Sequence, residues 1–317
     1  AKDGGGVFLV VYIILALTFG FALMTTEIAL GRKTGHSCIK AYSDVDKRFA
    51  FLGPVSFLVP FIIFPYYCVI GGWVTKYTVE YIVGRGVETV ADGFFGSFIS
   101  AQWSPLIWCG VFLAVSAGVV FFGVEKGIEK FSKVLMPALC VLIVGVAIFS
   151  LTVKDPNSGR TAMQGLKIYI VPDFTGMTIG KFFGILLDAM GQIFFSMSLA
   201  MGIMVTYGSY SRKNTNLVKS VNQIEIFDTA IALIAGLIMI PAVYTFQGTE
   251  GLNAAGPSLL FISLPKVFDA MGFAGNFVGA AFFVLVLFAA LTSSVSLMEA
   301  IVSMIMDNSG WSRKKSS

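Results

Sequence analysis

Long apolar runs separated by short polar segments dominate this sequence. A helix needs about 20 apolar residues to cross a lipid bilayer, and seven runs are near or above that length. They are Val7–Ala29, Val55–Val83, Pro105–Phe122, Val134–Thr152, Phe182–Tyr210, Val221–Phe246 and Phe277–Met306. The second, fifth, sixth and seventh are longer than a bilayer requires, so we expect tilted or broken helices there. The pattern predicts an all-α polytopic membrane protein, with residues 1–317 in a single transmembrane domain.

The stretch from Gln192 to Tyr210, in the fifth run, differs from an ordinary membrane helix. Its middle, Ser196–Gly202, holds small and weakly polar residues and no Val or Ile. Serine can hydrogen-bond nearby backbone instead of supporting the helix, and glycine costs about 1 kcal/mol relative to alanine. In lipid, a broken helix is tolerated only where its freed backbone groups face protein or a water-filled cavity. Two interpretations stay open: a binding site built from main chain, and a small-residue packing face between helices.

The composition supports a membrane protein and excludes several other classes. The chain is 56% hydrophobic and only 13% charged, where a soluble domain carries roughly 25% charge. Its net charge of +4 indicates no nucleic-acid partner, because the basic residues lie in loops. The four cysteines form no C-x-x-C pair and His36 is the single histidine, so a zinc site is not expected.

The distribution of basic residues predicts the orientation in the membrane. The segments after the first, third, fifth and seventh runs hold twice as many lysines and arginines as the remaining segments. Because basic loops stay in the cytoplasm, we expect an external N-terminus and a cytoplasmic C-terminus. Ala1 follows neither an initiator Met nor a signal peptide. We therefore expect at least one span upstream and a sequence that is a fragment of a longer chain.

Polar residues within the apolar runs are the candidates for chemistry. Asp228 lies several residues inside the sixth run, where a carboxylate is costly and usually functional. It indicates a metal-ion or proton site, or else a structural carboxylate bonded to hydroxyls or amides. Thr292 and Ser293 offer hard oxygen ligands that suit sodium, or hydroxyls bonded to their own helix. Glu27 lies near Arg32, with which an interfacial charge pair is one interpretation.

Several short motifs occur together in an order that is typical of one family. They are Gly4-Gly5-Gly6, Glu27-Ile28-Ala29-Leu30-Gly31-Arg32, Tyr66-Tyr67, Gly127-Ile128-Glu129-Lys130, Pro172-Asp173-Phe174, Gly191-Gln192-Ile193-Phe194-Phe195-Ser196, Thr206-Tyr207-Gly208-Ser209-Tyr210 and Ala290-Leu291-Thr292-Ser293-Ser294. On these motifs the chain resembles the neurotransmitter:sodium symporters, in particular their bacterial amino-acid transporters. The resemblance implies a truncated inverted-repeat sodium symporter fold with one broken helix, covering family helices two to eight. Helix one and the helices after the eighth would then be absent.

The resemblance also implies roles for individual residues. The substrate pocket would comprise Ile63, Tyr67, Phe195, Ser196, Ser198, Met201, Ser293 and Leu297. Two sodium sites would use Ser196 and Asp228 in the first, and the Ala289 carbonyl, Thr292 and Ser293 in the second. Tyr210 and Asp307 would belong to a cytoplasmic gate, and Glu27 would support the broken helix.

The function implied is sodium-coupled symport of a neutral, apolar or aromatic amino acid by alternating access. We expect a multi-pass protein of the bacterial inner membrane, with sodium as its ion, no organic cofactor and no enzymatic activity. Asp228 stands where many members have Asn, which predicts independence of chloride. A seven-helix receptor is the topological alternative, although Phe277–Met306 lacks the lysine that retinal requires. An inactive truncated product is the other alternative, and the oligomeric state stays open.

Overall fold

The computed structural model describes residues 5–122, 128–155, 158–212, 214–252 and 256–316. Within these ranges the chain forms helices, together with two isolated β-bridges, Gly5 to Pro172 and Lys154 to Thr161. Seven helical segments there are long and apolar enough to cross a membrane. They are Gly6–Thr34, Lys47–Ile82, Ser104–Phe121, Lys133–Ser150, Ile179–Ser196, Leu217–Gly251 and Phe273–Ser309. The predicted all-α polytopic fold is confirmed.

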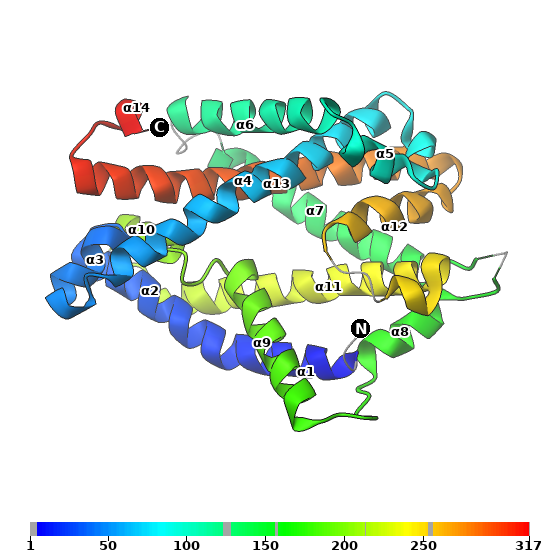
Figure 1. Ribbon diagram of the computed structural model, residues 1–317, viewed down its shortest axis with the longest axis horizontal. Coiled ribbons are helices and arrows are strands. Elements are labelled where there is room, and N and C mark those ends of the chain that lie inside the picture. Colours follow the sequence, from blue (N-terminus) through cyan, green and yellow to red (C-terminus); the bar gives the residue numbers. More distant parts are fainter. Residues whose placement is uncertain (1–4, 123–127, 156–157, 213, 253–255, 317) are drawn as a thin grey trace.

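In Figure 1 most of the long helices run along the length of the molecule, α9 crosses the direction of α1 and α11, and the short helices gather at the two ends. The long elements are α1 (Gly6–Leu15), the π-helical η1 (Ala16–Gly20), α2 (Phe21–Thr34), α4 (Leu52–Ile82), α6 (Ser104–Phe122), α7 (Ile128–Ser150), α9 (Ile179–Ser196), α11 (Leu217–Gly251) and α13 (Phe273–Ser309). At one end lie α3 (Cys38–Val45), η2 (Lys47–Phe49), α10 (Ile203–Tyr210) and α14 (Arg313–Ser316). At the other end lie η3 (Gly86–Val90), α5 (Phe94–Ser100), α8 (Ala162–Ile170) and α12 (Ser258–Asp269). We call these the α3 end and the α12 end.

Aromatic packing joins α4, α12 and α13 near the α12 end. Tyr77 and Tyr81 of α4 pack their rings against Phe283 of α13, at centroid distances of 5.4 and 5.1 Å. Phe261 and Phe268 of α12 join the same buried cluster. A hydrogen bond from the Thr78 hydroxyl to the Phe283 carbonyl, 3.1 Å long, ties the two long helices together. Buried aromatic side chains supply much of a core's apolar area, so this cluster fixes α4 relative to α13.

Glycines allow α2 and α10 to cross at very short range. A Cβ atom at Gly31 would lie 1.9 Å from the Val205 carbonyl oxygen, and one at Gly208 would lie 2.4 Å from the Ile28 carbonyl oxygen. Small residues of this kind let membrane helices bring their backbones together. The second half of the broken span is therefore held closely against α2.

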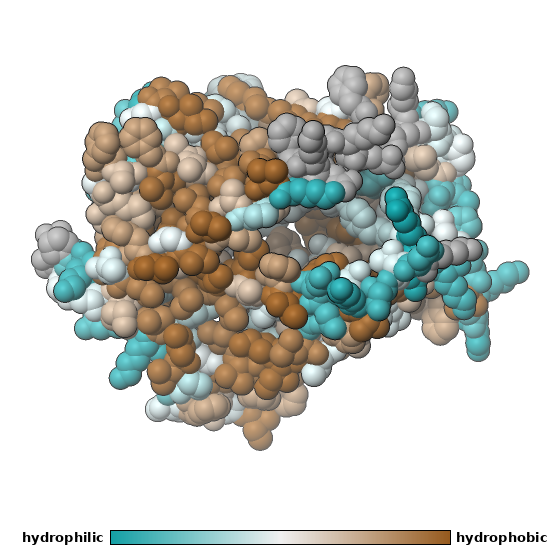
Figure 2. Space-filling view, turned by 180° about the vertical axis from the view of Figure 1, so that it is seen from behind, coloured by the Kyte–Doolittle hydropathy of each residue, from teal (hydrophilic) through white to brown (hydrophobic). Residues whose placement is uncertain are grey.

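The outer surface is that of a membrane protein. Large apolar side chains are exposed along the long helices, among them Ile14, Leu17, Phe183 and Leu187. Figure 2 shows hydrophobic residues over much of one face, with hydrophilic residues concentrated toward its edges. Lipid tails accept such a surface, whereas water would not.

Candidate functional site

The fifth span is broken in its middle, as predicted. Helix α9 ends at Ser196 and α10 begins at Ile203. Between them Ser198 and Ala200 have left-handed backbone conformations, with φ of 54° and 57°. Such angles are uncommon outside glycine, and each costs on the order of 1–3 kcal/mol, so they persist only where the surroundings enforce them.

A carboxylate from α2 stabilises this break. The Ala200 amide donates a hydrogen bond of 2.8 Å to Oε1 of Glu27, whose side chain is 4% exposed. One backbone N–H freed by the break is therefore satisfied by a carboxyl oxygen. Arg32 does not pair with Glu27, because its guanidinium donates to the Thr215 carbonyl. Of the two interpretations of Glu27, the geometry agrees with support of the broken helix.

A cavity of about 310 Å³, which we call the central cavity, lies beside the break. All eight residues predicted for the substrate pocket line it: Ile63, Tyr67, Phe195, Ser196, Ser198, Met201, Ser293 and Leu297. They come from α4, the broken span and α13, which are far apart in the sequence. No charged side chain lines this cavity.

Four lining residues were missed by the sequence reasoning: Ile203, Met204, Tyr207 and Ser296. Tyr207 and Ser296 share a hydrogen bond of 2.8 Å between their hydroxyls, which links α10 to α13. Helical spacing could have indicated both, since Ser296 lies three residues after Ser293 and Tyr207 lies three after Met204. Residues three or four apart share a helix face.

The oxygens predicted for the second sodium site lie on one turn of α13. The Thr292 hydroxyl donates a 2.9 Å hydrogen bond to the Ala289 carbonyl, and the Ser296 hydroxyl donates to the Thr292 carbonyl. Hydroxyl and carbonyl oxygens keep lone pairs after such bonds form. The donor set therefore still fits a small hard cation, next to Ser293 in the cavity wall.

The two side chains predicted for the first sodium site are in contact. The Ser196 hydroxyl donates a hydrogen bond to Oδ2 of Asp228, which joins the end of α9 to α11. Tyr12 of α1 lies beside this pair, with its side chain 3% exposed and its ring within electrostatic reach of Asp228. Its hydroxyl lies next to the Ser196 hydroxyl. The sequence contained no signal for Tyr12, because nothing in α1 marks it among other apolar positions.

Polar groups also meet at the α3 end. The Tyr210 hydroxyl contacts both Glu299 and Ser303, with 3.3 Å to Oε1 of Glu299. Asp307 lies two turns beyond Glu299 on α13, and its carboxylate accepts a 2.6 Å hydrogen bond from the Ser37 amide. The two predicted gate residues, Tyr210 and Asp307, thus each make hydrogen bonds at the α3 end.

Two of the motifs in the sequence fall partly outside the described residues. Gly4 and Gly127 lie there, and the side chains of Glu129 and Lys130 are likewise not described. The remaining motif residues lie within the described ranges.

Comparison with known proteins agrees with the geometry. A sequence model described as the sodium:neurotransmitter symporter family matches residues 1–85 and 98–316. The chain is 36% identical over 320 residues to YhdH of Bacillus subtilis, described as an uncharacterized sodium-dependent transporter, with 99% of this chain and 67% of YhdH covered. It is 32% identical over 321 residues to an uncharacterized sodium-dependent transporter of Haemophilus influenzae, with 96% and 67% covered.

A solved structure shares the fold. The crystal structure of MhsT in complex with L-phenylalanine matches with a TM-score of 0.89 and 35% sequence identity, covering 99% of this chain and 69% of MhsT. The chain thus spans about two thirds of the length of these relatives. On the family match, the relatives and the shared fold, the chain belongs to the sodium:neurotransmitter symporter family, a family of sodium-dependent membrane transporters.

Proposed function

We propose that this chain forms the central part of a sodium-coupled symporter for a neutral, apolar or aromatic amino acid. One observation carries the proposal: the eight predicted residues line a single cavity of about 310 Å³ beside a broken membrane helix. Ligand pockets span roughly 300–1,000 Å³, so the central cavity has room for one small molecule.

The lining chemistry supports the substrate class. Ile63, Met201 and Leu297 offer apolar contacts, and methionine adapts its shape to different side chains. Serine hydroxyls, the Tyr67 hydroxyl and the irregular main chain at Ser198 supply the polar contacts that an ammonium and a carboxylate require. Because no charged side chain lines the wall, a substrate with a charged side chain would be desolvated without compensation. Phe195, 46% exposed, would close over the bound substrate.

Sodium would bind at the two predicted sets of oxygens. Asp228 and Ser196 would hold the first ion, and the Ala289 carbonyl with the Thr292 and Ser293 hydroxyls would hold the second. Ser196 and Ser293 each lie in the wall of the central cavity. Each ion would therefore touch a residue that also faces the substrate. Sodium and substrate would be coupled because each binds the outward and inward states with different affinity.

Transport would draw on the sodium gradient and the membrane potential, about 2.3 kcal/mol per charge per 100 mV. In this proposal the basic α3 end faces the cytoplasm of a bacterial cell and the groups around Tyr210 and Asp307 open to release the substrate. We further propose that the complete transporter has helices before and after this chain, since the relatives are longer. The family match favours transport over a seven-helix receptor, and an inactive truncated product is the remaining alternative.

The complete transporter, reconstituted in proteoliposomes, tests the function. We expect accumulation of L-phenylalanine under an inward sodium gradient and none when potassium replaces sodium. A competition profile led by lysine or glutamate, or uptake that ignores sodium, would contradict the proposal.

Chloride dependence tests the role of Asp228 separately. Because this fixed carboxylate supplies negative charge beside the first sodium site, replacing chloride with gluconate should leave uptake within about twofold of its original rate. Collapse of uptake in gluconate would show that Asp228 does not take the place of an anion.

A further inference from the structure

A second cavity, of about 250 Å³, lies at the α12 end, and we call it the outer cavity. One wall is the segment from Thr89 to Gly96, which includes Asp92 and Phe95. The other wall is α12, through Phe261, Ile262 and Lys266. No residue of the outer cavity lines the central cavity, so the proposed transport site does not account for it.

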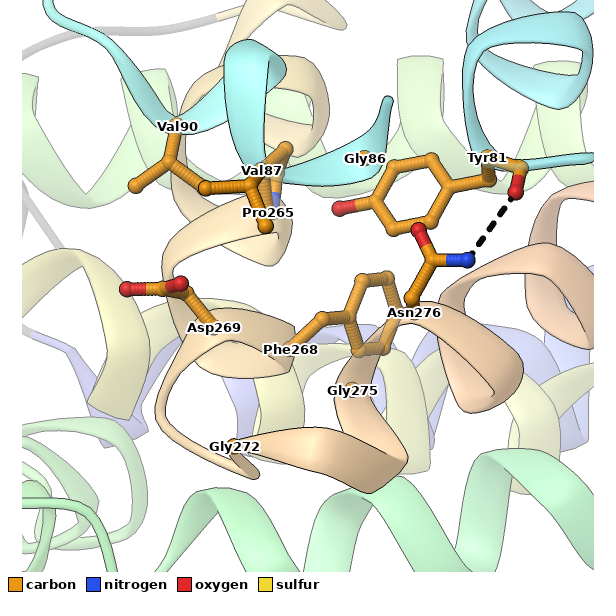
Figure 3. Close-up of a pocket in the computed structure, with 10 residues that line it drawn as sticks. All are labelled: Tyr81, Gly86, Val87, Val90, Pro265, Phe268, Asp269, Gly272, Gly275 and Asn276. Carbon is orange, nitrogen blue, oxygen red and sulfur yellow. Dashed lines mark hydrogen bonds between the residues drawn. The ribbon is translucent and has the colours of Figure 1, made fainter. Parts of the chain in front are cut away.

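The first wall lies outside the family match, because that match stops at residue 85 and resumes at residue 98. The segment is nevertheless well anchored. On the other side of η3, Tyr81, Val87, Val90 and Phe268 surround a space of only about 40 Å³ (Figure 3). Asn276 secures this base, because its amide nitrogen donates a 3.2 Å hydrogen bond to the Tyr81 carbonyl. The outer cavity is therefore built between a supported segment outside the family match and α12, which lies within it.

Two buried aromatic rings, Phe95 at 6% exposure and Phe261 at 2%, form part of the floor of the outer cavity. The rings of Phe95 and Phe261 are stacked, with 5.6 Å between their centroids and an interplanar angle of 3°. Trp73 of α4 meets both rings edge-on, at 5.0 and 5.7 Å. Such a surface suits an apolar or aromatic side chain.

The mouth of the outer cavity carries one charge of each sign. The Lys266 ammonium donates a 2.9 Å hydrogen bond to Oδ1 of Asp92. The hydrogen bond from Lys266, together with its positive charge, lowers the pKa of Asp92 below its ordinary value, so this carboxylate is ionised at neutral pH. The Asp92 side chain is 92% exposed and that of Lys266 is 20% exposed. Because the Asp92 carboxylate is almost fully in solvent, it can separate from Lys266 and be hydrated by water.

We propose that the outer cavity binds the zwitterion of a free apolar or aromatic amino acid without sodium. Its carboxylate would pair with Lys266, its ammonium with Asp92, and its side chain would lie on Phe95 and Phe261. In such a ligand the opposite charges sit on neighbouring groups, so it inserts between Lys266 and Asp92 and leaves neither charge unpaired. The volume lies just below the range of drug-sized pockets, which fits one amino acid.

Trp73 gives a direct readout, because its indole contacts both rings of the aromatic surface. L-Phenylalanine is titrated into the complete transporter in sodium-free potassium buffer while tryptophan fluorescence is recorded. We expect a saturable change that is lost in Trp73→Phe. Absence of a saturable change in the unsubstituted protein, or an unaltered change in Trp73→Phe, would overturn the proposal.

Two further variants separate binding from structure. Lys266→Ala removes a charge-assisted contact and should weaken binding about tenfold or more, whereas Lys181→Ala, an exposed lysine of α9, should not. Gly96 lines the cavity, and a Cβ there meets no atom within 4 Å, so Gly96→Trp should obstruct the cavity and abolish the response. Unchanged affinity in Lys266→Ala or in folded Gly96→Trp would overturn the assignment. If sodium-driven uptake fails in the proteoliposome assay, that result contradicts the proposed function only. The outer-cavity proposal is tested separately, because the fluorescence titration contains no sodium.

Discussion

The central and outer cavities show two ways of recognising a small molecule. The central cavity lies in the middle of the bundle, has no charged side chain in its wall, and depends on irregular main chain held by Glu27. The outer cavity lies at the α12 end and combines the Lys266–Asp92 ion pair, of which only Asp92 is exposed, with stacked aromatic rings. In the middle of a membrane protein, backbone groups provide polarity without the cost of an unpaired charge. Near water, charged side chains can provide the polar contacts, because the free-energy cost of desolvating them is small.

The largest difference between the two cavities should come from Asp228→Ala. Removing this carboxylate deprives the first proposed sodium ion of its charged ligand, so sodium-dependent L-phenylalanine binding should weaken roughly 100-fold. Binding to the outer cavity in sodium-free buffer should not change. Equilibrium binding of labelled L-phenylalanine measures both, with Asp269→Ala at the α12 end as the control. Equal weakening with and without sodium would remove the distinction between the cavities.

The second largest effect should come from a substitution at the α2–α10 crossing, because it displaces α10, which follows the break in the fifth span. In Gly208→Ala the new Cβ meets backbone 2.4 Å away, which forces the helices apart and should cost on the order of 1–3 kcal/mol of stability. Gly110→Ala is the matched control, since a Cβ there meets no atom within 4 Å. Thermal unfolding in detergent compares the two variants. Equal melting temperatures would show that the close crossing does not hold α10 in place.

Glu27→Gln should have a smaller effect that is confined to the central cavity. The amide oxygen can still accept from the Ala200 N–H, so amino-acid binding should weaken by no more than about tenfold. Glu27→Ala, which removes the acceptor, should weaken it further. Isothermal titration with L-phenylalanine in sodium buffer measures the affinity of each variant. Weaker binding by Glu27→Gln than by Glu27→Ala would contradict the prediction.

The smallest effect concerns pH at the outer cavity. Lys266 lowers the pKa of Asp92. The carboxylate is therefore fully ionised well above the ordinary Asp pKa of about 3.9, and it loses its negative charge only when the pH falls through the lowered pKa. Sodium-free binding should therefore stay constant from about pH 5 to 8. A decline across that range in the Trp73 fluorescence titration would show that another group controls the outer cavity.

Features encoded locally could be predicted from the sequence, and features created by packing could not. Apolar run length located the seven spans, and the weak helix formers around Ser198 indicated the break. Tyr12 gains its position only when α1 meets α9, so no local pattern marks it. The outer cavity depends on docking of residues 89–96 against α12, a contact between segments more than 160 residues apart.

A crystal structure of the complete transporter with sodium and L-selenomethionine would test the central claim most directly, because selenium scatters anomalously. We predict an anomalous peak beside the break, between Ile63, Met201 and Leu297, with Ala200 still bonded to Glu27. A continuous helix through residues 197–202, or a central cavity without selenium while the peak lies elsewhere, would contradict the account.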